Sequence, residues 1–179
     1  MTTDAREIAS REHRGQVDAA GRDYVEAHLT PIAEAAAVFG PDAEAAGWLH
    51  DVIEDTDVTA EQLAEWGVSA EVIAAVESVT RRSDETYAQL IDRSCAHPLG
   101  RLVKLADNAW NITSNPVLAR TDPQRAATML AEKYLPARAR LLAAAGLNEK
   151  SPDVVRLRAV LDRHHTRLQA APASDPTSR

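Results

Sequence analysis

Residues 47–56 read Gly47-Trp48-Leu49-His50-Asp51-Val52-Ile53-Glu54-Asp55-Thr56, and they place four ionisable side chains at the end of an apolar helical run. Residues four apart share one face of a helix, so the histidine lies with Glu54 and Asp51 lies with Asp55. Such charges are costly to hold beside an apolar core unless a partner compensates them. A divalent cation is such a partner, because imidazole and carboxylate are its ligands. The stretch therefore predicts a metal site.

Two more residues of the right kind lie elsewhere in the chain. His28 lies just before a predicted helix start, and Asp107 lies on a helix whose other residues are mostly apolar. Two histidines and two aspartates suit a borderline-to-hard ion such as Mn²⁺, with positions left for water and substrate. The alternatives are an ion pair of Asp107 with Lys104, three residues away, and a helix-flanking role for His28.

Helix signals recur along the whole chain. Asp4 with Glu7, and Thr59 with Gln62, have the spacing of capping boxes, and glycines stand where helices would stop. Apolar residues recur at steps of three and four, while strand-like alternation is nearly absent. The sequence therefore predicts an all-α fold. We expect helices near residues 4–19, 31–39, 42–53, 60–65, 69–79, 84–96, 99–113, 122–144 and 152–169.

Length and composition indicate one domain. The chain has 179 residues, of which 45% are hydrophobic and 26% charged, and this is enough to bury a hydrophobic core without disulfides or structural metals. We expect a single domain over residues 1–170 and a disordered tail over residues 171–179, which are small, polar and proline-bearing. Pro136 falls inside the expected helix 122–144 and predicts a kink or break near Leu135.

The charge balance excludes several classes of partner. Lys and Arg total 20 against 27 Asp and Glu, so the formal net charge is −7. Such a chain has no general field that draws it to nucleic acid or to an anionic membrane. The single cysteine, Cys95, fits a reducing compartment. The chain begins without a signal-peptide pattern and has no apolar run of the ~20 residues that cross a bilayer. We expect a soluble cytoplasmic protein.

The order of the candidate residues carries a resemblance to a known family. His28 comes first, His50-Asp51 with Glu54-Asp55 follows, and Asp107 ends the run Val103-Lys104-Leu105-Ala106-Asp107. This order resembles the HD superfamily of metal phosphohydrolases. More narrowly, it resembles the hydrolase domain of RelA/SpoT proteins and the stand-alone small alarmone hydrolases.

The resemblance implies a helical HD-domain bundle that holds a Mn²⁺ ion. The implied ligands are His28, His50, Asp51 and Asp107. The implied reaction removes the 3′-pyrophosphate from guanosine tetra- or pentaphosphate and leaves GDP or GTP. Glu54 and Asp55 would then deprotonate the metal-activated water or protonate the leaving oxygen. Asn111, one helical turn after Asp107, matches the family's asparagine that contacts the nucleoside, and Ser114 stands where the family often has threonine.

The sequence departs from the family pattern at two places near its N-terminus. His13-Arg14-Gly15-Gln16 resembles the family's His-x-Gly-Gln element, but Val17-Asp18-Ala19-Ala20 stands where the family usually has a basic pair that holds guanine and its phosphates. Between Tyr24 and His28 there is one residue more than the usual pattern. The first departure bears on which substrate is bound, and the second bears on whether His28 is a metal ligand.

Without the basic pair, other cations must bind the phosphates. Arg81 and Arg82 follow a predicted helix end, and Lys104 lies on the helix that carries Asp107. Arginine suits bidentate capture of phosphate, and the lysine could also reach a phosphate, so these three residues are the candidate phosphate contacts. The alternative functions are an HD phosphohydrolase of another nucleotide, such as a nucleoside monophosphate or NADPH, and a catalytically silent nucleotide-sensing module.

Overall fold

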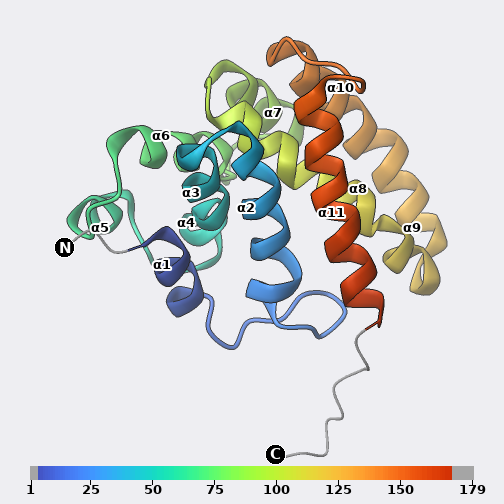
Figure 1. Ribbon diagram of the computed structural model, residues 1–179, viewed down its shortest axis with the longest axis horizontal. Coiled ribbons are helices and arrows are strands. Elements are labelled where there is room, and N and C mark those ends of the chain that lie inside the picture. The colour runs from blue at the N-terminus through green and yellow to red at the C-terminus, as the bar shows by residue number, and fades with distance from the viewer. Residues whose placement is uncertain (1–3, 171–179) are drawn as a thin grey trace, which may run out of the picture.

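Helices make up the regular secondary structure of residues 4–170, which the computed structural model describes (Figure 1). The helices are α1 Ala5–Glu12, η1 Val25–Leu29, α2 Thr30–Ala36, η2 Ala37–Phe39, α3 Pro41–Leu49, α4 Val52–Asp55, α5 Ala60–Glu65, α6 Ala70–Val79, α7 Tyr87–Ala96, α8 Gly100–Thr121, α9 Pro123–Thr128, η3 Met129–Tyr134, α10 Leu135–Ala144 and α11 Pro152–Ala170. Of these, η1 and η3 are π-helical and η2 is a 3₁₀ helix. Within residues 4–170, the sole β-pairing is an isolated bridge between Val17 and Asp23. The predicted all-α class is confirmed.

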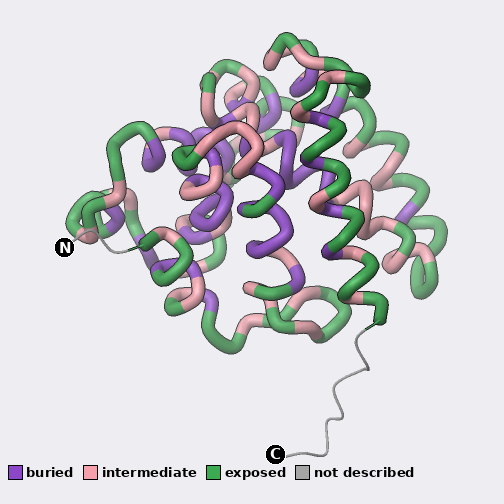
Figure 2. Tube along the Cα trace, viewed as in Figure 1, coloured by how far each residue is buried: buried purple, intermediate pink, exposed green. Residues whose placement is uncertain are grey.

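The core forms where α2 and α3 pack against each other and against α8. In Figure 1, α2 lies between α3 and α11, and its buried residues form a nearly continuous stripe in Figure 2. Gly47 allows the close approach of α3 to α2. A Cβ at Gly47 would lie 2.9 Å from the Cα of Ala33 and 3.2 Å from the Cβ of Ala36. The packing of these small residues therefore fixes the end of α3, where His50 follows.

Capping residues begin the helices at several predicted positions. The carboxylate of Asp4 accepts a hydrogen bond from the backbone N–H of Arg6 at 3.0 Å. Thr59 and Gln62 form a reciprocal capping box, with bonds of 2.9 and 3.3 Å. These bonds satisfy N–H groups that have no partner inside the helix.

The prediction of a helix over residues 4–19 is wrong beyond Glu12. Gly15 adopts a φ of +81°, a left-handed conformation that turns the chain away from the helix axis. Asp18 then holds a loop, because its carboxylate accepts hydrogen bonds from the N–H groups of Ala20 and Arg22, both at 2.9 Å. This loop leads the chain to Tyr24, beside the candidate site.

The helix expected over residues 42–53 is interrupted. It ends at Leu49, and a new helix begins at Val52. The carbonyl of Gly47, which would accept the N–H of Asp51 in a continuous helix, lies 2.8 Å from Nδ1 of His50 and accepts its N–H. The histidine side chain therefore competes with the backbone at the point of interruption.

Two later helices also differ from the expected ranges. The helix expected over residues 99–113 continues as α8 through Pro116 to Thr121. At the kink or break expected near Leu135 the winding changes without interruption, from the π-helical segment η3, which ends at Tyr134, to α10, which begins at the next residue. Pro136 has no N–H to donate to the carbonyl one turn earlier, so regular α-winding is not favoured there.

The expected tail over residues 171–179 lies outside the described residues. Among residues 4–170, no helix is both long enough and apolar enough to cross a membrane.

Candidate metal centre

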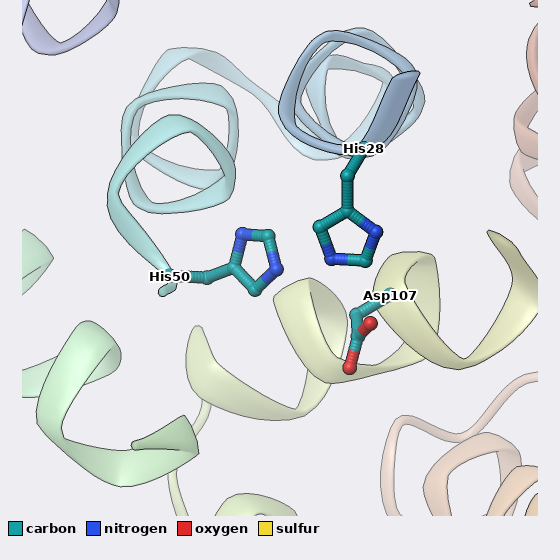
Figure 3. A group of neighbouring side chains, drawn as sticks. All are labelled: His28, His50 and Asp107. Carbon is teal, nitrogen blue, oxygen red and sulfur yellow. The ribbon is translucent and has the colours of Figure 1, made fainter. Parts of the chain in front are cut away.

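Three candidate ligands from distant parts of the chain converge at one place. His28 comes from η1, His50 from the end of α3, and Asp107 from the middle of α8. Figure 3 shows the two imidazoles and the carboxylate pointing toward one another. One ligand atom from each residue lies within 4.8 Å of the others. Such a group could hold a divalent metal ion.

Asp51 lies against both imidazoles. Its Oδ2 is 3.2 Å from Nε2 of His28 and 3.0 Å from Nε2 of His50. Adjacent residues of an unbroken helix point in different directions, so His50 and Asp51 can face one site because the helix is interrupted between them. The carboxylate of Asp51 also accepts a hydrogen bond of 2.6 Å from the hydroxyl of Tyr24.

His50 presents a nitrogen that suits a cation. Its Nδ1 donates to the Gly47 carbonyl, which leaves the lone pair of Nε2 directed at the cluster in the neutral ring. That Nε2 is buried, and its contact in the described residues is the 3.0 Å approach of Asp51 Oδ2, which lacks hydrogen-bond geometry. Burial alone would lower the pKa of His50, but the carboxylates of Asp51 and Asp107 raise it to about 9. The local field therefore favours positive charge, and the donor set fits a bound cation.

Two neighbours on α8 hold the carboxylate of Asp107. Asn111 donates from Nδ2 to Oδ1 at 2.8 Å, and Lys104 lies 2.7 Å from Oδ2. Burial would raise the pKa of Asp107, but Lys104, His50 and His28 lower it. The ion pair considered as an alternative for Asp107 is therefore present, and it coexists with the cluster. Partners of this kind orient metal-binding carboxylates.

Glu54 and Asp55 are exposed at the end of α4, which directly follows Asp51, and both line one hollow. The Oε2 of Glu54 accepts the backbone N–H of Arg81 at 2.8 Å, which fixes the direction of this carboxylate. Partial burial and the charge of Asp51 raise the pKa of Asp55. Two carboxylates, one held by a backbone N–H and one with a raised pKa, are suited to proton transfer.

A cavity of about 370 Å³ opens beside His28. It is lined mainly by apolar groups of α8 and by the loop over residues 17–22. Trp110 forms part of its wall, and the indole Nε1 donates to the carbonyl of Ala27 at 3.1 Å. The volume and the aromatic wall suit a ring system of nucleobase size next to the cluster.

Known proteins are similar in sequence to this chain over about three quarters of its length. A Haemophilus influenzae protein named guanosine-3′,5′-bis(diphosphate) 3′-pyrophosphohydrolase is 34% identical over 146 residues, covering 75% of this chain and 21% of that protein. An Aquifex aeolicus protein of the same name is 31% identical over 147 residues, covering 76% of this chain and 21% of that protein. The chain thus spans about a fifth of the length of these curated relatives. No family model matches the chain.

A solved structure shares the fold. A metazoan orthologue of SpoT, described as hydrolysing ppGpp, matches with a TM-score of 0.63 and 21% sequence identity, covering 92% of this chain and 93% of that chain. The resemblance to the RelA/SpoT hydrolase domain is confirmed. The shared helical fold agrees with the HD-domain bundle that the resemblance implies.

Relative to the RelA/SpoT pattern, this chain has one additional residue between Tyr24 and His28. The π-helical turn η1, Val25–Leu29, covers this part of the chain. A π-turn accommodates one residue more than an α-turn, so the insertion does not remove His28 from the cluster.

Tyr24 is a site residue that the sequence interpretation missed. Its ring stacks on His28 with a centroid distance of 4.9 Å, and its hydroxyl also lies 3.4 Å from Oδ2 of Asp55. The available signal was its position one helical turn before His28. His13 extends the same row of rings, with its centroid 5.4 Å from that of Tyr24, and its Nδ1 lies 2.8 Å from Oε1 of Gln16.

The candidate substrate contacts are divided among different places. Asn111 is held by Asp107, while Ser114 lines the cavity and donates to the carbonyl of Trp110 at 2.8 Å. The backbone of Arg81 meets Glu54 at the cluster, whereas Arg82 lines a separate hollow between α6 and α7. The structure therefore does not bring the two arginines together.

Proposed function

We propose that this protein is a divalent-metal-dependent phosphohydrolase that removes the 3′-pyrophosphate from guanosine tetra- or pentaphosphate, leaving GDP or GTP. The observation that carries the proposal is the convergence of His28, His50 and Asp107 in a chain whose relatives are named for this reaction. The adjoining carboxylates and cavity supply the other parts that such a reaction needs.

We assign the metal to His28, His50, Asp51 and Asp107. A set of two imidazoles and two carboxylates suits Mn²⁺ among the available ions. When bound, such an ion supplies Lewis acidity and makes a water nucleophile available near neutral pH. Tyr24 and Asn111 hold the carboxylates of Asp51 and Asp107, so the ligand oxygens are oriented before substrate arrives.

Glu54 and Asp55 manage protons in this proposal. The Arg81 N–H occupies Oε2 of Glu54, which leaves Oε1 to accept a proton from the attacking water. The raised pKa of Asp55 favours a carboxyl group that can give a proton to the leaving oxygen. The two roles can be exchanged, because both carboxylates lie at the same edge of the cluster.

The nucleoside lies in the cavity beside His28 in this proposal. Trp110 provides an apolar wall, and Ser114 provides a hydroxyl. Asp18, which replaces part of the family's basic pair, does not present a free negative charge to the substrate. The guanidinium of Arg22 donates to its Oδ2 at 2.6 and 2.8 Å. The acidic replacement is therefore offset by an arginine of the same loop.

A second candidate is hydrolysis of another phosphorylated nucleotide, such as a nucleoside monophosphate or NADPH. The observation in its favour is the loop over residues 17–20, which supplies no cation to the cavity. Arg22 is the one cation among the cavity's described lining residues, and Asp18 neutralises it.

A substrate panel tests the choice. Purified protein with Mn²⁺ is assayed against guanosine tetraphosphate, a nucleoside monophosphate and NADPH, and kcat/KM is compared. We expect the highest value for guanosine tetraphosphate. Preference for either of the others would transfer the assignment to that nucleotide, and metal binding without turnover on any of them would favour a sensing module.

A further inference from the structure

Lys133 is a cation that the site described above does not use. It lies in the π-helical segment η3 and is half-buried. Its Nζ lies 4.4 Å from the ring centroid of Tyr87 and 5.9 Å from that of Tyr134. No carboxylate in residues 4–170 forms an ion pair with it, whereas Lys104 pairs with Asp107.

The packing places Lys133 on a particular side of the cluster. Along α8, Lys104 lies one turn before Asp107, whereas the cavity residues Trp110 and Ser114 follow it. The segment η3 packs on α8 through a 3.0 Å hydrogen bond from Asn108 Nδ2 to the carbonyl of Tyr134. Lys104 and Asp107 both act electrostatically on Lys133, and Lys133 is not among the residues that line the cavity. These observations assign Lys133 to the side of the site that carries Lys104.

Several positive charges gather at that end. Burial and the neighbouring Lys104 and Arg81 lower the pKa of Lys133, although Asp107 and Glu54 oppose this effect. We call Arg81, Lys104 and Lys133 the basic wall. The chain as a whole has a formal net charge of −7, so this local group of positive charges is opposite in sign to the protein.

The environment of Lys133 favours an anionic ligand. A half-buried ammonium group without a carboxylate partner is unfavourable, and nearby cations add repulsion. The faces of Tyr87 and Tyr134 offset part of this cost through cation–π contacts. A multiply charged anion bound at the basic wall would offset the remaining cost of burying this ammonium group. The π-helical winding of η3 is also a feature that occurs often at functional sites.

We propose that Lys133 binds the diphosphate group of the substrate, on the side of Asp107 opposite the cavity. The nature of the substrate rests on the proposed function. In this arrangement the nucleoside occupies the cavity, and the ammonium group donates hydrogen bonds to the oxygens of the diphosphate. Lys133 thereby supplies positive charge that the loop over residues 17–20 lacks.

Binding of inorganic pyrophosphate tests the proposal without requiring turnover. Calorimetric titration of the Mn²⁺-loaded protein is compared for wild type, Lys133→Met, Lys133→Arg and Lys150→Met. Lys150 is an exposed lysine in the turn before α11, so its variant controls for the loss of one positive charge. We expect Lys133→Met to weaken pyrophosphate binding about tenfold or more, equal to about 1.4 kcal/mol. Lys133→Arg should retain most of the affinity, and Lys150→Met should match wild type.

Equal affinities for wild type and Lys133→Met would overturn the proposal, as would absence of pyrophosphate binding to wild type. Equal losses in Lys133→Met and Lys150→Met would also overturn it, because the effect would then be one of general charge. Thermal unfolding checks that each variant is folded, and Lys133→Gln replaces Lys133→Met if the latter is not. A protein that binds pyrophosphate through Lys133 but leaves guanosine tetraphosphate intact would overturn only the proposed function.

Discussion

The hydroxyl of Tyr24 provides a sharp test of how the candidate metal centre is held. Tyr24→Phe removes one oxygen atom and keeps the ring that stacks on His28. The lost group donates a 2.6 Å hydrogen bond to Oδ2 of Asp51 and lies 3.4 Å from Oδ2 of Asp55. The substitution therefore disturbs the support of a ligand carboxylate without removing a ligand.

The expected effect follows from the charge of the acceptor. A hydrogen bond to an ionised group contributes about 1.5–3 kcal/mol. Since about 1.4 kcal/mol corresponds to a factor of ten, the apparent Kd for Mn²⁺ should rise about 10- to 100-fold. This range agrees with the usual effect of removing a residue that orients a metal ligand. Thermal unfolding without metal is measured alongside, so that a general loss of stability is distinguished from a loss of metal affinity.

The measurement is a Mn²⁺ titration of metal-stripped protein, with competition by a chelating dye. Tyr134→Phe is the matched control, because it loses a hydroxyl near the site that makes no hydrogen bond within residues 4–170. Wild-type affinity in Tyr24→Phe would refute the role assigned to the hydroxyl. Equal losses in both tyrosine variants would do so as well, since only one of the hydroxyls contacts a proposed ligand.

Three further predictions concern packing, proton transfer and pH. Gly47→Ala should destabilise the protein by about 1–3 kcal/mol, because the new Cβ would lie 2.9 Å from the backbone of Ala33. Calorimetry should show a lower Tm, and an unchanged Tm would contradict the close contact between α2 and α3. Glu54→Gln should bind Mn²⁺ as wild type does but lose most turnover, so full activity in this variant would remove its proton role. Hydrogen bonds from Arg138 lower the pKa of Glu149, so this group stabilises the fold above its unfolded pKa near 4.5, and the contribution is lost as pH falls through the lower folded value. Because Glu149 is half exposed, the contribution should be below about 1 kcal/mol. Urea unfolding should show a stability difference between wild type and Glu149→Gln at neutral pH and none at about pH 2. A difference that persists in acid would contradict this assignment.

Local sequence signals were sufficient for the fold class. Capping residues such as Thr59, and the change of winding near Pro136, depend on neighbours within one or two turns, so they can be predicted from the local sequence. The grouping of His50 with Asp107 was also predictable, because imidazole and carboxylate groups next to apolar runs need a shared partner.

Side-chain contacts, local as well as tertiary, decided what helical periodicity could not show. The loop after Gly15 and the interruption at His50 both depend on side chains that take backbone hydrogen bonds, which periodicity does not reveal. The positions of Tyr24 and Lys133 depend on packing between elements far apart in the sequence. Arg81 and Arg82 are adjacent in sequence, yet the backbone of Arg81 meets Glu54 whereas Arg82 lines a hollow between α6 and α7.

Product analysis tests the central proposal most directly. Protein loaded with Mn²⁺ is incubated with guanosine tetraphosphate, and the products are separated by anion-exchange chromatography. We expect GDP and pyrophosphate in equal amounts, with the reaction abolished by a chelator and by Asp51→Ala, which should also lose the metal. Intact guanosine tetraphosphate after incubation with metal-loaded wild type, or undiminished turnover by metal-free Asp51→Ala, would contradict it.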